Sequence, residues 1–334
     1  QQVEAAKTGL DLIQADRGGL VYQPRIGLYC NVAQIDFTSM YPAIIINGNI
    51  SPEVPLPDGL VPASTELGIV PLTLKPLYEK RVLIKEMLMD IPDKTGTIAK
   101  SYAARASALK WLLVVCFGFL GYKNARFGRI EAHEAVTRGG REALLLAKEA
   151  CEDFGFEVLH MFVDALWIRQ TGYRKVADFT PVLEEISRRT GIKISLDGIF
   201  RWIAFLPSRS NDDQPIPNRY FGVFKDGSLK IRGIEARRHD MPPWIVTTQS
   251  DMLELLSRAH DARQLPDYLP DAFRVFSNAL EALNADQIAP ELLVLTTRIS
   301  RDLELYKSPT AAVRAARQLL ERTGKRTVPG QKIR

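Results

Sequence analysis

The heptapeptide Asp36-Phe-Thr-Ser-Met-Tyr-Pro42 decides the fold of this chain. It places one carboxylate at the end of a β-forming run, Val32 to Phe37, and directly before the start of an expected helix. Thr38 and Ser39 are favoured N-cap residues, and Pro42 suits the first helical turn. A strand that presents an aspartate beside free helical N–H groups suits a divalent cation and a phosphate chain. The heptapeptide therefore predicts a site for a metal ion and a phosphorylated ligand.

The composition is that of a globular protein. The chain has 334 residues, of which 46% are hydrophobic and 25% are charged, enough for two or three packed subdomains. The longest apolar run, Trp111 to Tyr122, contains two glycines and is too short to cross a bilayer, so no membrane association is expected. No secretory signal opens the chain, and the first residue, Gln1, indicates a fragment or a processed product.

The cysteines and the net charge bear on the cellular setting and the partners. Cys30, Cys116 and Cys151 are far apart and form no CxxC pair, which indicates neither a disulfide framework nor a zinc site. We therefore expect a reducing, cytoplasmic location. The net charge of +5 and the pI of about 9.0 give a mild preference for polyanionic partners.

Basic residues concentrate in two stretches of the chain. Residues 311–334 contain seven Lys or Arg and a single acid, Glu321. A solvated helix face would explain this stretch on its own, whereas the second cluster favours a track for nucleic acid. The first stretch holds Arg314, Arg317, Arg322, Lys325, Arg326, Lys332 and Arg334, and the second holds Arg219, Lys225, Lys230, Arg232, Arg237 and Arg238.

The hydrophobic pattern predicts an α+β body followed by a mostly helical region. Two helices with a short connection between them predict an antiparallel helical hairpin. The expected helices are 72–90, 97–117, 131–153 and 176–190, and the expected strands lie within 17–37, 157–169, 192–205 and 219–234. Residues 51–71 are rich in proline and glycine and are expected to form a loop, residues 91–96 a turn, and the chain beyond residue 245 mainly helices.

The run from Val158 to Ile168 is apolar apart from His160 and Asp164. Asp164 has two interpretations. It can lie at a hairpin turn, where its side chain satisfies backbone amides. Alternatively it pairs with Asp36 on a neighbouring strand, and the two carboxylates bind two Mg²⁺ ions that clamp an in-line phosphoryl displacement.

Three cations on the expected helical hairpin are candidates for a phosphate clamp. Arg81 and Lys85 are four residues apart and share one face of the first helix, and Lys110 lies near the end of the second. Ordinary solvated surface positions are the alternative. A triphosphate held between carboxylate-bound metals and these cations is a coherent geometry for phosphoryl transfer.

Taken in order, these segments resemble the catalytic core of a family B DNA polymerase. The matching segments are Asp36–Ile45 with Asn49–Pro52, Arg81–Lys85, Ala108–Tyr122, His160–Ile168, and Arg219–Tyr220 with Gly233–Asp240. The resemblance implies a right-hand α+β fold. The antiparallel-sheet palm would comprise 1–70 and 119–242, the two-helix fingers 71–118, and the mainly helical thumb 243–334. The N-terminal and exonuclease domains are expected to be absent from this chain, and proofreading is not expected within it.

The resemblance also implies roles for individual residues. Asp36 and Asp164 would be the catalytic, metal-binding carboxylates, with the carbonyl of Phe37 as a further ligand to two Mg²⁺ ions. Tyr41 would lie against the sugar of the incoming dNTP and exclude a 2′-hydroxyl. The other nucleotide-binding residues would be Ser39, Met40, Arg81, Lys85 and Lys110. Primer–template DNA would be contacted by Phe117, Gly118, Arg219, Tyr220, Arg237 and Arg238.

Departures from the family pattern keep a second function open. Phe162 replaces the first acid of the family's Asp-Thr-Asp triplet, Val114-Val115 replaces its Asn-Ser, and Phe117 replaces a tyrosine. These changes resemble the divergent second branch of prokaryotic family B enzymes. One hypothesis is an active, nucleoid-associated polymerase serving replication, repair or translesion synthesis. The other is a catalytically inactive remnant that acts as a DNA-binding structural subunit. A nuclease built on two carboxylates is poorly served by Tyr41 and the cations.

Overall fold

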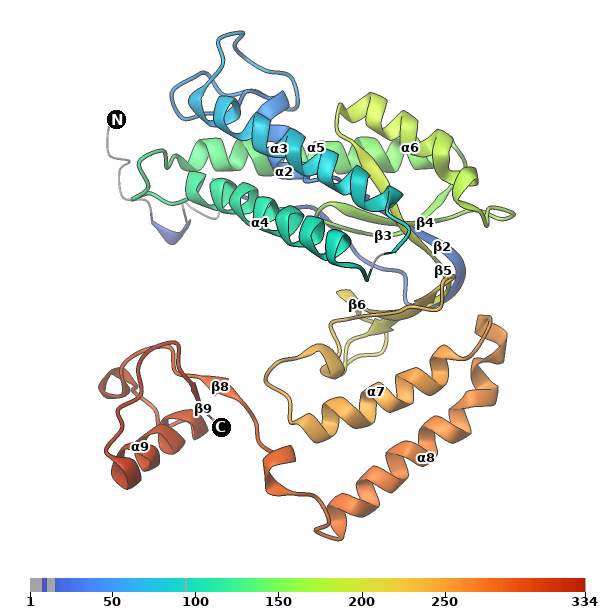
Figure 1. The fold of residues 1–334 in the computed structure, drawn as a ribbon, viewed down its shortest axis with the longest axis vertical. Coiled ribbons are helices and arrows are strands. Elements are labelled where there is room, and N and C mark those ends of the chain that lie inside the picture. The colour runs from blue at the N-terminus through green and yellow to red at the C-terminus, as the bar shows by residue number, and fades with distance from the viewer. Residues whose placement is uncertain (1–7, 11–15, 94, 334) are drawn as a thin grey trace. The chain divides into compact units, whose positions relative to one another are not determined.

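The structure is a computed structural model that describes residues 8–10, 16–93 and 95–333 (Figure 1). Gln1 and Arg334, and Lys94 of the expected turn, lie outside the described residues. Contacts divide the chain into two units. The first comprises Gln1–Arg25, Asn31–Phe200 and Pro215–Pro217, and the second comprises Ile26–Cys30, Arg201–Gln214 and Asn218–Arg334.

A sheet with antiparallel pairing carries the residues singled out in the sequence. Seven strands pair in the order β1-β3-β4-β2-β5-β6-β7. Their bounds are β1 Val21–Tyr22, β2 Gly27–Phe37, β3 Glu157–Phe162, β4 Ala165–Arg169, β5 Ile194–Pro207, β6 Pro215–Phe224 and β7 Leu229–Arg232. β2 and β4 run antiparallel, with Ile35 opposite Leu166 and Asp36 opposite Ala165. This register brings the end of β2 to the start of β4.

Helices α2 to α6 accompany the strands of the first unit. They are α2 Met40–Asn47, α3 Ile69–Asp90, α4 Thr97–Leu120, α5 Ile130–Asp153 and α6 Val176–Thr190. α5 buries its small apolar residues at helical spacing, among them Ala132, Val136 and Ala143, in the same core as Ile35 and Phe37 of β2. α3 and α4 lie side by side as a hairpin (Figure 1). The core thus fixes β2 and α5, while the hairpin covers the end of β2.

The second unit is mainly helical, and two small cores are found among its described residues. It contains α7 Pro243–Ser257, α8 Leu265–Asn284, α9 Ala311–Thr323, and the short strands β8 Thr297–Arg298 and β9 Lys332–Ile333. One core centres on Trp202, whose indole N–H donates to the Ala259 carbonyl at 3.0 Å. The other is formed by Ile299, Leu303, Val313, Ala316 and Ile333.

The predicted helices agree with the structure to within three residues at each end, whereas two strand predictions were wrong. The single strand expected over 157–169 is the hairpin β3–β4, and the strand expected over 219–234 is the hairpin β6–β7. The first hairpin turns through Val163, at a φ of 59°. A hairpin turn was one of the two interpretations given for Asp164, but β-branched residues rarely adopt positive φ, so the part played by Val163 was not predictable from local propensity.

The expected capping of α2 was also wrong in one respect. Ser39 precedes the helix, but its side chain makes no capping hydrogen bond. Its hydroxyl instead accepts a hydrogen bond from Arg81. A long-range contact has therefore replaced the local one.

α4 qualifies the expectation about membranes. By length and composition alone, this one helix of the described chain is long and apolar enough to cross a membrane. The earlier expectation rested on the shorter run Trp111–Tyr122. α4 packs against α3 and carries Lys110, which lines the pocket described below. One such helix is weak evidence for a membrane span.

Candidate active site

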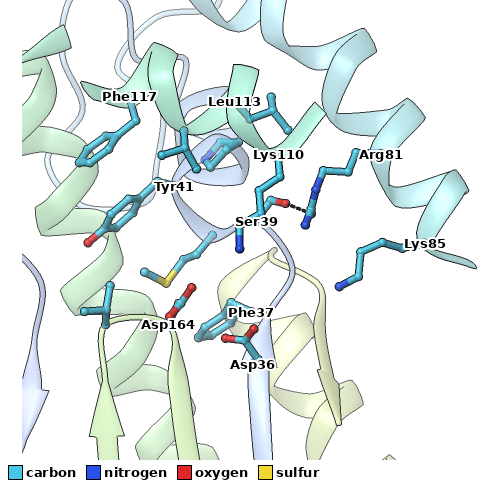
Figure 2. Close-up of a pocket in the computed structure, with 14 residues that line it drawn as sticks. Asp36, Phe37, Ser39, Tyr41, Arg81, Lys85, Lys110, Leu113, Phe117 and Asp164 are labelled. Carbon is cyan, nitrogen blue, oxygen red and sulfur yellow. Dashed lines mark hydrogen bonds between the residues drawn. The ribbon is translucent and has the colours of Figure 1, made fainter. Parts of the chain in front are cut away.

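A pocket in the first unit gathers nearly all of the residues that the sequence analysis assigned to that unit's site (Figure 2). It encloses about 290 Å³ and lies where the end of β2, the β3–β4 turn and helices α2, α3 and α4 meet. Its lining residues are Asp36, Phe37, Ser39, Met40, Tyr41, Pro42, Arg81, Lys85, Lys110, Leu113, Val114, Phe117, Val163 and Asp164. Of the residues predicted for this unit's site, Gly118 alone does not line it.

The two carboxylates come from adjacent strand ends. The backbone N–H of Phe37 donates to the Asp164 carbonyl at 2.9 Å, next to the pairing of Asp36 with Ala165. The N–H of Asp164 donates to the Phe162 carbonyl at 2.7 Å and closes the tight turn. Asp164 is therefore both a turn residue and a neighbour of Asp36. Both side chains point into the same pocket (Figure 2).

The electrostatic setting of Asp164 suits a cation. Burial raises the pKa of its carboxyl group above the ordinary value, and the positive charge of Lys110 opposes that rise. Among the described residues, no salt bridge reaches this carboxylate. A buried carboxylate without a cationic partner is costly when ionised, and a bound cation would remove that cost.

The donor set fits Mg²⁺ rather than a softer metal. Asp36 and Asp164 offer carboxylate oxygens, and Phe37, beside them on the pocket wall, offers a backbone carbonyl. In the part of the chain that the structure describes, no group of three or more His, Cys, Asp or Glu side chains could hold a metal ion. Mg²⁺ is usually held by one or two carboxylates together with substrate phosphates, so two carboxylates are sufficient.

Three cations lie across the pocket from the carboxylates (Figure 2). Burial lowers the pKa of Arg81 and of Lys85, and the negative charge of Asp36 opposes the shift in both. For Lys85, the positive charges of Arg81 and Lys110 lower the pKa further. Half-buried cations that crowd one another in this way are stabilised by a polyanion placed among them.

The start of α2 adds backbone donors to the same wall. Ser39, at a φ of 54°, makes no side-chain cap because its hydroxyl is engaged by Arg81. The first N–H groups of a helix have no intrahelical partner and favour anions. Ser39 and Met40, at the start of α2, thus line a pocket that three cations also line.

Aromatic and aliphatic side chains close the pocket. The ring centroids of Tyr41 and Phe117 lie 4.4 Å apart. Burial, reinforced by the negative charge of Asp164, raises the pKa of Tyr41 to about 12, so its hydroxyl stays protonated at neutral pH. Val114 lines the pocket, whereas Val115 is 44% exposed and does not. Of the two valines, Val114 therefore contributes to the apolar wall of the pocket, together with Leu113.

Sequence reasoning missed three of the lining residues: Pro42, Leu113 and Val163. Leu113 stands three residues after Lys110 on the same helix face, a signal that was present in the sequence. Val163 carried no such signal, because its position depends on its positive φ in the β3–β4 turn.

The second unit holds a basic cleft of its own. It is lined by Arg237, Arg238, His239, Asp240, Thr296, Thr297, Arg298 and Lys332. Arg237 and Arg238 were expected to contact DNA, whereas Arg298 was missed. The pairing of β8 with β9 sets Arg298 opposite Lys332, and no local sequence pattern links these two positions. Within the cleft, the Arg238 guanidinium pairs with Asp240 at 2.6 Å.

Two other residues expected to contact DNA lie outside the lining of this cleft. Tyr220 is 1% exposed and packs on Phe205 with ring centroids 5.8 Å apart, so its side chain is a core residue. Arg219 donates to the Pro207 carbonyl at 2.9 Å. Burial of an aromatic ring in a strand of this kind is not visible in a two-residue motif.

Comparisons with known proteins agree with these observations. A family model described as DNA polymerase family B matches residues 7–58 and 54–166. DNA polymerase 2 of Saccharolobus solfataricus is 33% identical over 258 residues, which cover 77% of this chain and 38% of that protein. The DNA polymerase of a Thermococcus species is 28% identical over 335 residues, which cover 95% of this chain and 40% of that protein.

A solved structure gives the same result for the fold. The family B DNA polymerase from Pyrobaculum calidifontis superposes with a TM-score of 0.60 and 25% identity, covering 94% of this chain and 40% of that chain. The chain spans about two fifths of the length of the relatives that it matches.

Proposed function

This chain contains a family B DNA polymerase region, and on that premise we propose that it is a template-directed DNA polymerase. As a DNA-directed nucleotidyltransferase, it would add dNTPs to a primer 3′ end by phosphoryl transfer with two Mg²⁺ ions. One observation carries the proposal. A single pocket sets two carboxylates, Asp36 and Asp164, across from three cations on a helical hairpin.

The carboxylates would hold the metal ions. Asp36 and Asp164, with the Phe37 carbonyl, supply the oxygen ligands that Mg²⁺ requires. When bound, such ions stabilise the charge on the attacking and leaving oxygens of an in-line displacement. The residues themselves fix where the primer end and the nucleotide phosphates meet, because both strand ends are held by the β2–β4 register.

The opposite wall would hold the triphosphate. Arg81, Lys85 and Lys110 neutralise its charge, and the N–H groups at Ser39 and Met40 donate to its oxygens. Because these residues line one pocket, a nucleotide bound among them would require little reorganisation of the protein. Catalysis of phosphoryl transfer depends mainly on such positioning and charge stabilisation.

Tyr41 would control the choice of sugar. Its ring lines the pocket next to Phe117, with a hydroxyl that stays protonated. A 2′-hydroxyl on the incoming nucleotide would collide with a ring held in this position. The expected substrates are therefore deoxynucleotides.

The rest of the chain would hold DNA. We assign the palm to residues 1–70 and 119–242, the fingers to 71–118 and the thumb to 243–334, which puts the helical hairpin in the fingers. Arg237, Arg238, Arg298 and Lys332 form a cleft suited to the phosphate backbone. Such contacts are independent of base sequence and depend strongly on salt.

Metal-dependent primer extension tests the proposal. Asp36→Ala and Asp164→Ala should each lower Mg²⁺-dependent incorporation of dNTPs by several orders of magnitude, because the metals carry most of the charge stabilisation. Asp251→Ala, at an exposed position on α7, is the matched control and should leave the rate unchanged. The absence of incorporation by the unmodified chain, or full activity in Asp164→Ala, contradicts the proposal.

A second candidate function rests on Phe162 and Val114. Phe162 stands where the family has an acid, and Val114 puts an apolar side chain in the pocket wall. A remnant that only binds DNA would give salt-sensitive binding to primed DNA and no incorporation. If the chain is active, the same apolar wall suggests tolerant insertion opposite damaged bases. If the chain copies undamaged templates but fails to extend primers opposite every lesion tested, the proposed insertion opposite damaged bases is contradicted.

A further inference from the structure

A series of four side chains leads out of the pocket from Tyr41. The Tyr41 ring contacts Phe117, and Phe117 stacks on His133 with ring centroids 4.3 Å apart and an interplanar angle of 21°. Nδ1 of His133 lies 3.0 Å from Oδ2 of Asp16. These residues belong to α2, α4, α5 and the segment before β1, so the series joins parts of the first unit that are distant in sequence.

The carboxylate of Asp16, at the far end of this series of side chains, is held by hydrogen bonds. Its second oxygen, Oδ1, accepts from the backbone N–H of Gly18 at 2.9 Å and from the hydroxyl of Thr137 at 3.0 Å. The side chains of Asp16 and His133 are 20% and 16% exposed. Two donors hold Oδ1, and Oδ2 lies within ion-pair distance of His133, so a rotation of the carboxylate would lose the hydrogen bonds to Oδ1.

His133 is confined on the side away from its carboxylate partner. A Cβ on Gly121 would lie 2.9 Å from Cδ2 of the imidazole, so the backbone approaches the ring closely. The imidazole is thus bounded by Phe117 and by the backbone at the end of the same helix, α4. Close packing of this kind transmits a displacement rather than absorbing it.

Tyr41 is confined in the same way at the other end of the series. A Cβ on Gly140 would lie 2.9 Å from Cε1 of Tyr41, and one on Gly19 would lie 3.1 Å from its hydroxyl oxygen. With backbone close on two edges and Phe117 against its ring, Tyr41 has one position in the pocket. The stack therefore completes a cage around the ring.

We infer that His133, held by Asp16, positions Phe117 and through it Tyr41, and thereby sets how strictly the pocket excludes a 2′-hydroxyl. This inference rests on the proposed function, in which Tyr41 faces the sugar. His133 and Asp16 are positioning residues, since they act through Phe117. Discrimination against a single added oxygen depends on how closely the excluding group is held, so a small shift of the ring is sufficient to change it.

Sugar discrimination is the first test. His133→Ala should lower the ratio of kcat/KM for a dNTP to that for the matching ribonucleotide by about 3- to 10-fold, the size of one lost aromatic contact. Asp16→Asn should change the ratio in the same direction by less, and it serves as a second variant if His133→Ala does not fold. His260→Ala, an exposed histidine in the second unit, should leave the ratio unchanged.

A double-mutant cycle separates positioning from a general loss of structure. In a Tyr41→Ala background the ring to be positioned is missing, so adding His133→Ala should not change the ratio further. An undiminished effect of His133→Ala in that background overturns the inference.

A spectroscopic measurement makes the test independent of catalysis. The chain labelled with 3-fluorotyrosine gives a ¹⁹F resonance for Tyr41, assigned with Tyr41→Phe. That resonance should shift in His133→Ala and stay in place in His260→Ala. An unmoved resonance in a folded His133→Ala variant refutes the positioning role. If it moves but the unmodified chain incorporates no nucleotide, the positioning stands and the proposed polymerase function is what fails.

Discussion

Replacing Gly140 by alanine should disturb the nucleotide pocket more than it disturbs the fold. On α5, a Cβ at this position would lie 2.9 Å from Cε1 of Tyr41 and 3.0 Å from Cε of Met40. The end of the Met40 side chain is flexible and can turn away. The Tyr41 ring is rigid and has Phe117 against it, so it must shift toward Phe117 or into the pocket.

The expected magnitudes follow from two opposing effects. Alanine is more favourable than glycine in a helix interior by about 1 kcal/mol. Overpacking of a well-packed site costs about 1–3 kcal/mol. The free energy of unfolding should therefore fall by about 0–2 kcal/mol, a change that the chain can tolerate.

Gly139 provides a matched control on the same helix. A Cβ there would lie 2.9 Å from Cγ2 of Ile44 and 3.3 Å from Cδ2 of Leu60, neither of which lines the pocket. Gly139→Ala gains the same helix propensity and suffers similar crowding. It does not press on Tyr41, and any difference between the two variants therefore reports on the pocket.

Urea unfolding and single-nucleotide incorporation measure the two consequences. The variants should agree in free energy of unfolding to within about 1 kcal/mol, and Gly140→Ala alone should lower kcat/KM for dNTP by about 10-fold or more. Equal incorporation kinetics for the two folded variants would refute the reasoning. A Gly140→Ala variant whose free energy of unfolding rises by the full gain in helix propensity would also refute the reasoning, because the Tyr41 ring would then have moved at no cost.

Three further outcomes are expected. Asp164→Asn should raise the melting temperature at pH 7 without Mg²⁺, because the pKa of Asp164 is raised in the folded state and the protein loses stability as this carboxyl group ionises with rising pH. The gain in melting temperature should vanish below the ordinary pKa range of aspartate, where the carboxyl group is protonated in both states. A gain that persists there contradicts burial of the carboxylate as the cause. Trp202→Ala should lower the free energy of unfolding of the second unit by about 3–5 kcal/mol in urea, since the indole is fully buried and bonded to Ala259; a loss under 1 kcal/mol contradicts it. Arg237→Ala and Arg298→Ala should each reduce the slope of log affinity for primed DNA against log salt by about 0.9 in anisotropy titrations, and an unchanged slope removes the cleft from the DNA track.

The helices could be predicted because their signals are local. The spacing of Arg81 and Lys85 placed both cations on one face of α3, and the structure has them lining one pocket. The β-forming run Val32 to Phe37 predicted a strand, and β2 ends at Phe37. Periodicity and turn residues act over a few positions, and these features needed nothing more.

The remaining details depend on contacts between distant segments. Val163 adopts a positive φ that its side chain disfavours, and Ser39 accepts from Arg81 instead of capping its helix. The approach of His133 to Phe117 joins α5 to α4, and no spacing encodes it. Tertiary packing overrides local preference at such points, which cluster around the pocket rather than through the core.

The charges of the pocket distinguish the two candidate functions. Burial disfavours the ionised form of Asp164 and the protonated forms of Arg81 and Lys85, so both sides of the pocket are destabilised until ligands arrive. A cation beside the carboxylate and a polyphosphate among the cations relieve both sides at once. A subunit that only binds DNA needs exposed cations, such as those of the Arg237 cleft, and gains nothing from a buried carboxylate opposite crowded cations. The arrangement therefore favours the enzyme, despite the apolar substitutions around Asp164.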